Sequence, residues 1–185
     1  EDIRKACEVM QKGGVILYPT DTIWGIGCDA TNAEAVKRVY EIKKRSDSKA
    51  MLVLVDNAVK VDFYVDGAPE VAFDLIELTN KPLTIIYDGA KNLAPNLIAE
   101  DGSVGIRVTS EEFSNQLCYR FRKAIVSTSA NVSGEPSPAT FGEISDEIKQ
   151  AVDYIVQSRQ QENKASQSSS IIKLGKGGQV KVIRE

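Results

Sequence analysis

The sequence predicts an α/β fold, in which helices cover a β-sheet. The C-terminal end of the chain is predicted to be rich in β-strands. Short apolar runs typical of buried strands alternate with segments of helical periodicity along most of the chain. The hydrophobic content of 42% and the charged content of 26% are those of a globular protein. Because no linker or internal repeat divides the 185 residues, we expect a single domain over residues 1–185.

The N-terminal half alternates between predicted helices and strands. Helices are expected at residues 3–10 and 32–43, the second capped by Asn32, and buried strands at 15–18 and 51–55. Residues 56–78 are expected to be helical from a cap at Asp56, with a break near Gly67 and Pro69.

The C-terminal half continues the alternation and ends in strands. Strands are expected at residues 83–87, 104–108, 124–128 and 154–156, and helices at 110–120, capped by Ser110, and at 141–152. Residues 171–174 and 180–183 are expected to form a hairpin around the glycine-rich turn 175–178. The polar, low-complexity segment 157–168 is predicted to be mobile.

The composition excludes several kinds of active site. The chain has no histidine, so no Ser-His-Asp triad, Cys-His pair or histidine-containing metal site can form. Its three cysteines, Cys7, Cys28 and Cys118, form no C-x-x-C pair, which is typical of reduced thiols in a cytoplasmic protein. No run of about 18 apolar residues is present. The net charge of −3 argues against binding nucleic acid by bulk attraction, although local basic clusters exist.

The first candidate segment, residues 19–27, reads P-T-D-T-I-W-G-I-G and follows a buried strand. Two glycines at i and i+2 let the backbone approach a ligand closely. A G-x-G pattern alone is weak evidence for a dinucleotide site. The alternative is a tight connection between a strand and a helix with Trp24 in the core, and the segment taken alone favours that alternative.

The second candidate segment gathers four positive charges, Lys43, Lys44, Arg45 and Lys49, within seven residues. Lys43 and Arg45 diverge on a regular helix, but they can converge where the helix ends and the chain turns. Such a cluster can neutralise a triphosphate, because arginine binds through its fork and lysine as a point charge. The alternative is that cations simply stabilise a helix C-terminus.

The third candidate segment, residues 127–138, reads S-T-S-A-N-V-S-G-E-P-S-P and follows an apolar run. Its Ser127, Ser129 and Asn131 can donate hydrogen bonds to phosphate or ribose oxygens, although a solvated serine-rich turn is the alternative. If the strand carrying Arg107 and the strand before this segment are parallel neighbours, Arg107, loop 20–22 and Ser129 emerge at one sheet edge. Together these groups would form an anion-binding site that has no nucleophile–base pair. Such a site suits nucleotide binding and catalysis by positioning and charge stabilisation.

Five segments, taken in order, resemble the YrdC-like family of threonylcarbamoyl-adenylate synthases. They are Y-P-T-D-T-I-W-G-I-G-C-D-A at residues 18–30, K-K-R at 43–45, P-L-T at 82–84, V-G-I-R-V at 104–108, and the 127–138 segment. The resemblance covers about residues 14–140 and is weaker at 168–174. The chain departs from the family pattern at Ser46, where proline is usual, at 49–51, which often reads N-P-L, and at 168–170, which often reads Glu-Ser-Thr. It resembles the short, single-domain branch because it has no long C-terminal extension.

The resemblance implies both a fold and a reaction. The fold would be a twisted, open, mixed α/β sheet with helices packed on it and a concave, basic face. The reaction would join L-threonine, bicarbonate and ATP into threonylcarbamoyl-AMP and release pyrophosphate, with Mg²⁺ bound through the ATP phosphates and no metal site of the protein's own. A partner transferase would pass the threonylcarbamoyl group to the transfer RNA adenosine beside the anticodon. Direct binding of transfer RNA or double-stranded RNA stays open.

The resemblance also implies roles for individual residues. Lys43 and Arg45 would be the catalytic cations. The residues that would bind ATP are Lys43, Arg45, Lys49, Ser103, Ser129, Asn131, Ser137 and Arg184. The residues that would bind threonine are Thr22, Arg107, Ser127 and Ser169, with Arg107 pairing with the threonine carboxylate.

Three alternatives to the synthase remain. A non-enzymatic protein that binds structured or double-stranded RNA would use the basic concave face. A carbamoyl transferase like the related domain of hydrogenase maturation proteins is a second alternative, although the cysteine-rich zinc modules found beside that domain are not in this sequence. An inactive paralogue that kept the fold is the third, because fold does not fix function.

Overall fold

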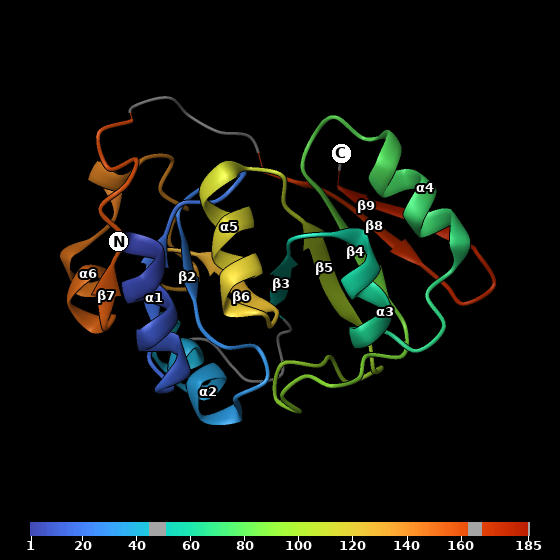
Figure 1. Ribbon diagram of the computed structural model, residues 1–185, viewed down its shortest axis with the longest axis horizontal. Helices are drawn as coiled ribbons and strands as arrows, with labels where there is room; N and C mark the ends of the chain where they lie inside the picture. The colour runs from blue at the N-terminus through green and yellow to red at the C-terminus, as the bar shows by residue number, and fades with distance from the viewer. Residues whose placement is uncertain (45–50, 163–167, 185) are drawn as a thin grey trace.

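The computed structural model describes residues 1–44, 51–162 and 168–184. These residues form one sheet of nine strands in the order β7-β1-β2-β6-β3-β5-β4-β8-β9 (Figure 1). The strands are β1 (Ile16–Tyr18), β2 (Gly25–Gly27), β3 (Leu52–Val55), β4 (Leu83–Tyr87), β5 (Val104–Val108), β6 (Ile125–Ser129), β7 (Tyr154–Ile155), β8 (Ser170–Leu174) and β9 (Val180–Arg184). The sheet is mixed, since β1 and β7, β3 and β5, and β4 and β8 pair in parallel and the other neighbours pair antiparallel.

Helices pack on this sheet, and the predicted mixed α/β class is confirmed. The helices are α1 (Asp2–Gln11), α2 (Ala33–Lys43), α3 (Val61–Tyr64), α4 (Glu70–Leu78), α5 (Glu112–Phe121) and α6 (Asp146–Ala151), with 3₁₀ turns η1 (Ala58–Lys60) and η2 (Phe141–Glu143). In Figure 1, α1 and α5 lie side by side in front of the central strands. None of the described helices is long and apolar enough to cross a membrane.

The register of the strands places the candidate site on a face of the sheet. Ile171, Thr84 and Arg107 lie opposite one another on β8, β4 and β5, and opposed residues project their side chains to the same face. Arg107 is also opposite Leu54 on β3, and Leu52 of that strand is opposite Ser127 of β6. Side chains from five strands therefore share one face.

The expectation that Arg107 and Ser129 emerge at a common sheet edge is wrong. It required parallel strands, whereas β5 is parallel to β3 and β6 is antiparallel to it. The carboxyl ends of β5 and β6 consequently lie at opposite ends of β3. The side chains meet because alternate residues project from one face, a property of strand register rather than of strand ends.

Strand β2 was not predicted, because residues 25–27 were expected to lie in a connection. Its two glycines give no hydrophobic alternation, but they fit between β1 and β6 where a side chain would not. A Cβ added to Gly27 would lie 2.5 Å from Tyr18 Cε1 and 2.8 Å from the Val126 carbonyl oxygen. The Tyr18 ring crosses β2 at this point, and its hydroxyl donates to that oxygen at 2.9 Å.

Several predicted helix boundaries also change. The helix expected at 141–152 is a 3₁₀ turn followed by the short α6, whose N-cap Ser145 accepts from the Ile148 amide. Helix α5 is capped by the Glu111 side chain rather than by Ser110. The helical stretch after β3 is divided into η1, α3 and α4, and Asp56 forms an ion pair with Lys60 instead of a helix cap.

The predicted C-terminal hairpin is confirmed as the antiparallel pair β8 and β9. The segment predicted to be mobile lies partly outside the described residues. Its described part is held by hydrogen bonds, because the Asp2 carboxylate accepts from the amides of Gln157 and Ser158 at 3.0 Å each.

We expect Gly27→Ala to lower the free energy of unfolding by about 2 kcal/mol, because the added methyl group collides with the Tyr18 ring and with backbone. Gly142→Ala is the matched control, since its Cβ would lie 4.0 Å from Thr140 Oγ1, which is an ordinary contact, and it should change stability by less than about 0.5 kcal/mol. Urea denaturation of both variants measures the difference. Equal effects at the two positions would contradict the close approach of β1, β2 and β6.

Candidate functional site

A cavity of about 280 Å³ lies over the sheet face that carries Arg107. It is bounded by the β1–β2 loop, the centre of the sheet, the segment after β6 and the C-terminal hairpin. Of the residues predicted to bind ligand, those that line it are Thr22, Arg107, Ser127, Ser129, Ser137, Ser169 and Arg184. The structure thus brings together residues separated by as many as 162 positions.

Arg107 is the centre of the polar network beneath this cavity. Its side chain is only 3% exposed, and its Nε donates to the two Asp21 carboxylate oxygens at 2.9 and 3.2 Å. Its Nη2 donates to Thr22 Oγ1 at 3.2 Å, and its Nη1 lies 3.4 Å from Thr84 Oγ1. The guanidinium is therefore held on three sides by the β1–β2 loop and strand β4.

Asp21 is the buried carboxyl partner of this arginine. Burial raises the pKa of the Asp21 carboxyl above its usual value, and the neighbouring Arg107 opposes that rise. The ion pair is buried on both sides, with the Asp21 side chain 11% exposed. An ionised Asp21 without Arg107 would carry an uncompensated buried charge, which costs several kcal/mol.

A second group of donors and acceptors borders the cavity at the C-terminal hairpin. Ser169 is buried, and its hydroxyl lies 2.8 Å from Thr84 Oγ1, the same oxygen that faces Arg107. Arg184 of β9 donates from Nε to the Ser169 carbonyl oxygen at 2.9 Å. The hairpin is thereby connected to the Arg107 network through two hydroxyl groups.

Lys43 lies beside the cavity instead of lining it. The residue is 2% exposed, and its Nζ donates to the carbonyl oxygens of Ser129 and Asn131 at 2.6 and 2.9 Å. The side-chain oxygens of the same two residues lie 3.3 and 3.2 Å from Nζ. The ammonium group therefore fixes the turn that presents Ser129 to the cavity.

Two further residues that were predicted to bind ATP make hydrogen bonds outside the cavity. Asn131 uses its amide group within the turn, donating to the Glu135 carbonyl oxygen at 2.6 Å. Ser103 lies at the start of β5, and its hydroxyl donates to Asp101 Oδ1 at 2.5 Å. Neither residue lines the cavity, and the predicted Arg45 and Lys49 lie outside the described residues.

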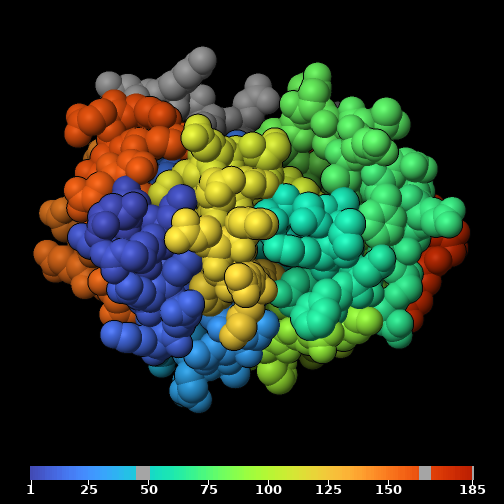
Figure 2. All heavy atoms as spheres, in the orientation of Figure 1, coloured from blue at the N-terminus to red at the C-terminus, as the bar shows by residue number. Residues whose placement is uncertain are grey.

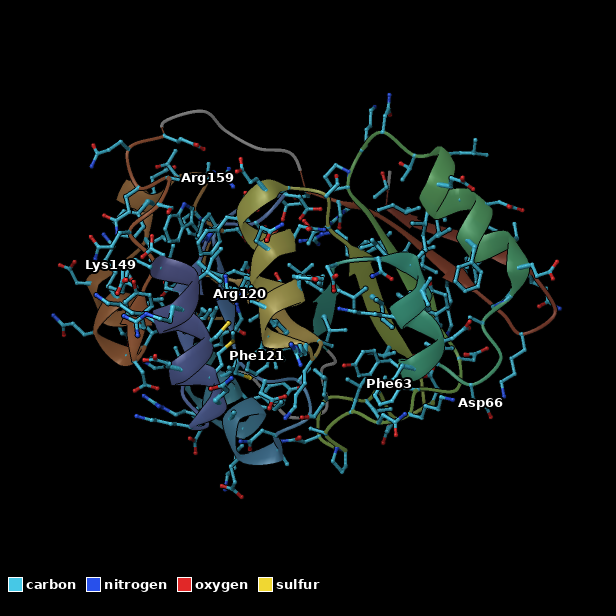
Figure 3. The ribbon with its side chains drawn as sticks, in the orientation of Figure 1. Phe63, Asp66, Arg120, Phe121, Lys149 and Arg159 are labelled. Atoms are coloured by element: carbon cyan, nitrogen blue, oxygen red, sulfur yellow. The ribbon has the colours of Figure 1, made fainter. Side chains whose placement is uncertain are left out.

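Sequence reasoning missed Thr84, although the P-L-T segment that carries it was recognised, and it missed Arg159 altogether. Arg159 donates from Nη1 to the Thr20 carbonyl oxygen at 2.9 Å and forms an ion pair with Glu111 at 3.1 Å. Since Glu111 also caps α5, this side chain connects the β1–β2 loop to that helix, near whose N-terminal end it lies (Figure 3). A lone arginine in a low-complexity segment gave no signal of this role.

The sequence profile of the Sua5/YciO/YrdC family, described as telomere recombination, matches residues 8–185. The chain belongs to this family. The resemblance found in the motifs is thereby confirmed over nearly the whole chain, including the C-terminal part where the motifs were weak.

The chain is similar to the threonylcarbamoyl-AMP synthase of Pseudoalteromonas translucida (strain TAC 125). The two are 32% identical over 157 residues, which cover 83% of this chain and 84% of that protein. Relatives of this kind support the assignment of the chain to the Sua5/YciO/YrdC family on sequence alone.

Solved structures of two Sua5/YciO/YrdC proteins share the fold. The crystal structure of E. coli YciO matches with a TM-score of 0.84 at 26% identity, over 99% of this chain and 88% of that chain. The crystal structure of P. abyssi Sua5 complexed with L-threonine matches with a TM-score of 0.83 at 23% identity, over 94% of this chain and 52% of that chain. The chain thus spans about half the length of P. abyssi Sua5, and that likeness concerns the fold alone.

We expect Lys43→Met to lower the free energy of unfolding by about 2 kcal/mol, because the part-buried carbonyl oxygens of Ser129 and Asn131 lose their charged donor. Lys44→Met is the matched control, since Lys44 is exposed and forms a surface ion pair of 3.0 Å with Glu147. That substitution should cost less than about 1 kcal/mol. Denaturation curves that shift equally for the two variants would contradict a positioning role for Lys43.

Ser103 is expected to control the ionisation of Asp101. Hydrogen bonds from the Ser103 hydroxyl and amide, together with Lys173, lower the pKa of Asp101 from 3.8 to about 2. This group therefore stabilises the fold above pH 3.8, and the contribution is lost as the pH falls toward 2. Ser103→Ala should move the pKa upward and weaken that acid dependence, as an NMR titration would show. Ser110→Ala, beyond the opposite end of β5, should leave it unchanged, and an unmoved pKa in Ser103→Ala would refute the assignment.

Proposed function

We propose that this chain is a threonylcarbamoyl-AMP synthase, which joins L-threonine, bicarbonate and ATP and releases pyrophosphate. The observation that carries the proposal is the buried Arg107 guanidinium, held by Asp21, Thr22 and Thr84 at the floor of a hydroxyl-lined cavity. An oriented guanidinium suits recognition of a carboxylate. The name of the Pseudoalteromonas translucida relative and the L-threonine bound to P. abyssi Sua5 support the same substrate.

Threonine is assigned to the part of the cavity around Arg107. Its carboxylate would pair with the guanidinium, and Thr22, Ser127 and Ser169 would supply hydroxyl groups around it. Thr84 belongs to this group as a positioning residue, because its hydroxyl connects Arg107 to Ser169. These hydroxyl groups would bind threonine through hydrogen bonds and add no charge. The amino acid would therefore be selected by the positions of the hydrogen-bonding groups.

ATP is assigned to the side of the cavity formed by Ser129, Ser137 and Arg184. Lys43 acts on this side through the turn that it holds, and a direct contact between Lys43 and a phosphate remains a prediction. Binding of ATP by Arg45, Lys49, Ser103 and Asn131 also remains a prediction. Among the described residues of this group, Arg184 is the one whose side chain is both exposed and cationic, so we assign it to the phosphates.

The proposed reaction requires the protein mainly to align the reactants and to neutralise phosphate charge. The threonine amine and bicarbonate would give a carbamate and release water. A carbamate oxygen would then attack the α-phosphate of ATP as pyrophosphate leaves. The barrier then falls through alignment of the reactants and neutralisation of the phosphate charge, and no protein nucleophile is required. A cavity lined by hydroxyls and guanidinium groups fits such a role.

Mg²⁺ would accompany the nucleotide. Among the described residues there is no group of three or more carboxylate or cysteine side chains able to hold a metal ion, and Asp21 at the cavity is engaged by Arg107. Mg²⁺ commonly binds proteins through substrate phosphates and water. We therefore assign the ion to the ATP phosphates.

The product would serve a transferase that modifies the adenosine beside the anticodon of transfer RNA. Bicarbonate, the transferase, the cytoplasmic location and the single-domain organisation are part of this proposal. An inactive paralogue of the same fold is a competitor. The grouping of the Arg107 guanidinium with the hydroxyls of Ser127 and Ser169 at one cavity favours an active enzyme.

We expect pyrophosphate release from ATP and bicarbonate to depend on threonine and to fall about 100-fold in Arg107→Ala, because the carboxylate loses its charged partner. Arg107→Lys keeps the charge but not the fork and should fall between the two. Arg38→Ala, which removes a half-buried arginine bound to Asp153 away from the cavity, is the control and should leave release unchanged. A colorimetric pyrophosphate assay measures all four proteins.

The double variant Arg107→Ala with Asp21→Asn separates loss of function from loss of folding, since it leaves no unpaired buried charge. It should be inactive and folded. Release by the wild type without threonine would point to a different acceptor. ATP binding without any release would support the inactive paralogue.

A further inference from the structure

The β1–β2 loop, residues 20–23, borders two open spaces. The first is the cavity at Arg107, which Thr22 lines. The second is a hollow of about 400 Å³, whose lining includes Asp21 and Arg159. Residues 20–23 form no backbone–backbone hydrogen bond with another segment of the described chain. Because packing and backbone pairing hold this loop weakly, side chains from other segments must fix its position.

Two arginines supply the contacts that fix the loop. Arg107 binds the Asp21 carboxylate from the floor of the cavity. Arg159 binds the loop backbone, since its Nη1 donates to the Thr20 carbonyl oxygen at 2.9 Å. The same nitrogen forms an ion pair of 3.1 Å with Glu111, whose carboxylate also caps α5. Arg159 does not line the cavity itself, so any effect it has on a ligand passes through the loop.

The backbone of Arg159 is strained. Its φ is 63°, in the left-handed region that favours glycine. The other non-glycine residues of the described chain with a positive φ are Asn92 and the helix C-caps Lys44 and Arg122, for which this conformation is common. Arg159 ends no helix. Strain of this kind persists only where surrounding contacts impose it, and it concentrates at functional sites.

The contacts that impose this conformation begin at α1. The Asp2 carboxylate accepts from the amides of Gln157 and Ser158, from the Ser158 hydroxyl at 2.8 Å and from the Tyr154 hydroxyl at 2.5 Å. Figure 2 shows the segment that follows β7, in orange, against α1 in blue and beside α5 in yellow. Arg159 therefore extends toward the loop from a backbone that α1 holds in place.

We infer that Arg159 is a positioning residue for threonine binding, because it holds the β1–β2 loop where Asp21 and Thr22 can contact Arg107. This inference rests on the proposed function, since threonine is the ligand assigned to that part of the cavity. The ion pair with Glu111 has an electrostatic consequence as well. Burial raises the pKa of Asp21, and the Glu111 carboxylate adds to that rise. The Arg159 guanidinium offsets the Glu111 charge and so favours the ionised Asp21 that pairs with Arg107.

The test uses Arg159→Gly, because glycine adopts a φ of 63° without strain and the variant should fold as the wild type does. We expect the KM for threonine to rise about tenfold in the pyrophosphate assay, whereas kcat and the KM for ATP change less than about twofold. Arg159→Lys keeps the charge but can reach only one of the two partners, so it should recover part of the threonine affinity.

A second measurement does not depend on catalysis. Trp24 is the only tryptophan of the chain, follows the loop directly and is 6% exposed. Acrylamide should quench its fluorescence about twofold more strongly in Arg159→Gly, because a loosened loop opens the ring to solvent. Glu162→Gln is the matched control, since it removes the surface ion pair of 3.0 Å to Arg159 and keeps the contacts with Thr20 and Glu111. It should show wild-type quenching and a wild-type KM for threonine.

Three outcomes would overturn the inference. An unchanged KM for threonine in Arg159→Gly would mean that Arg107 alone holds the loop. Equal increases in the KM for threonine and the KM for ATP would indicate a general loss of structure. An equal effect of Glu162→Gln would assign the change to surface charge. Absence of threonine-dependent release by the wild type would overturn the proposed function and the threonine role with it, whereas the quenching result would still establish or refute the contact between Arg159 and the loop.

Discussion

The buried ion pair between Arg107 and Asp21 holds the candidate site together. It joins the centre of the sheet to a loop 86 positions earlier in the chain, and either charge would be costly to bury without the other. Because the pair forms, the β1–β2 loop must lie over the sheet face, and Thr22 and Thr84 fall within reach of the same guanidinium. The cavity exists in its observed shape because this contact fixes one of its walls.

The opposite wall depends on glycine and on a buried lysine. Gly25 and Gly27 leave one face of β2 without side chains, which lets the Tyr18 ring reach across it to β6 and leaves room beside Ser127. Lys43 then holds the turn after β6 through carbonyl oxygens. Both walls are therefore set by long-range contacts, and the hydroxyl groups between them are positioned before any ligand arrives, which lowers the entropic cost of binding.

The sequence allowed the fold class and most of the polar residues that line the cavity to be predicted, because polar segments that follow buried strands are a local signal. The direction of a strand relative to its neighbours is not encoded in the local sequence. The pattern around Ser127 is the same whether β6 runs with β3 or against it, so the shared edge was expected and the shared face was not. Strand β2 escaped notice because glycines carry no hydrophobic period. The burial of Lys43 against Asn131 and the contact of Arg159 with Thr20 could not be predicted, because these partners are distant in the sequence and meet only in the folded protein.

The two arginines at the cavity differ in what their charge can do. Arg107 is neutralised by Asp21 in the resting protein, so its field ends within the site and the selection of a ligand rests on the placement of hydrogen-bond donors. Arg184 of the C-terminal hairpin is exposed where it lines the cavity, and its attraction extends about 8–10 Å at physiological salt. A buried, preorganised guanidinium suits the carboxylate of a small amino acid, whereas an exposed cation suits a polyphosphate that must be attracted before it is oriented. This difference in electrostatics is the reason for assigning the threonine carboxylate to Arg107 and the ATP phosphates to Arg184.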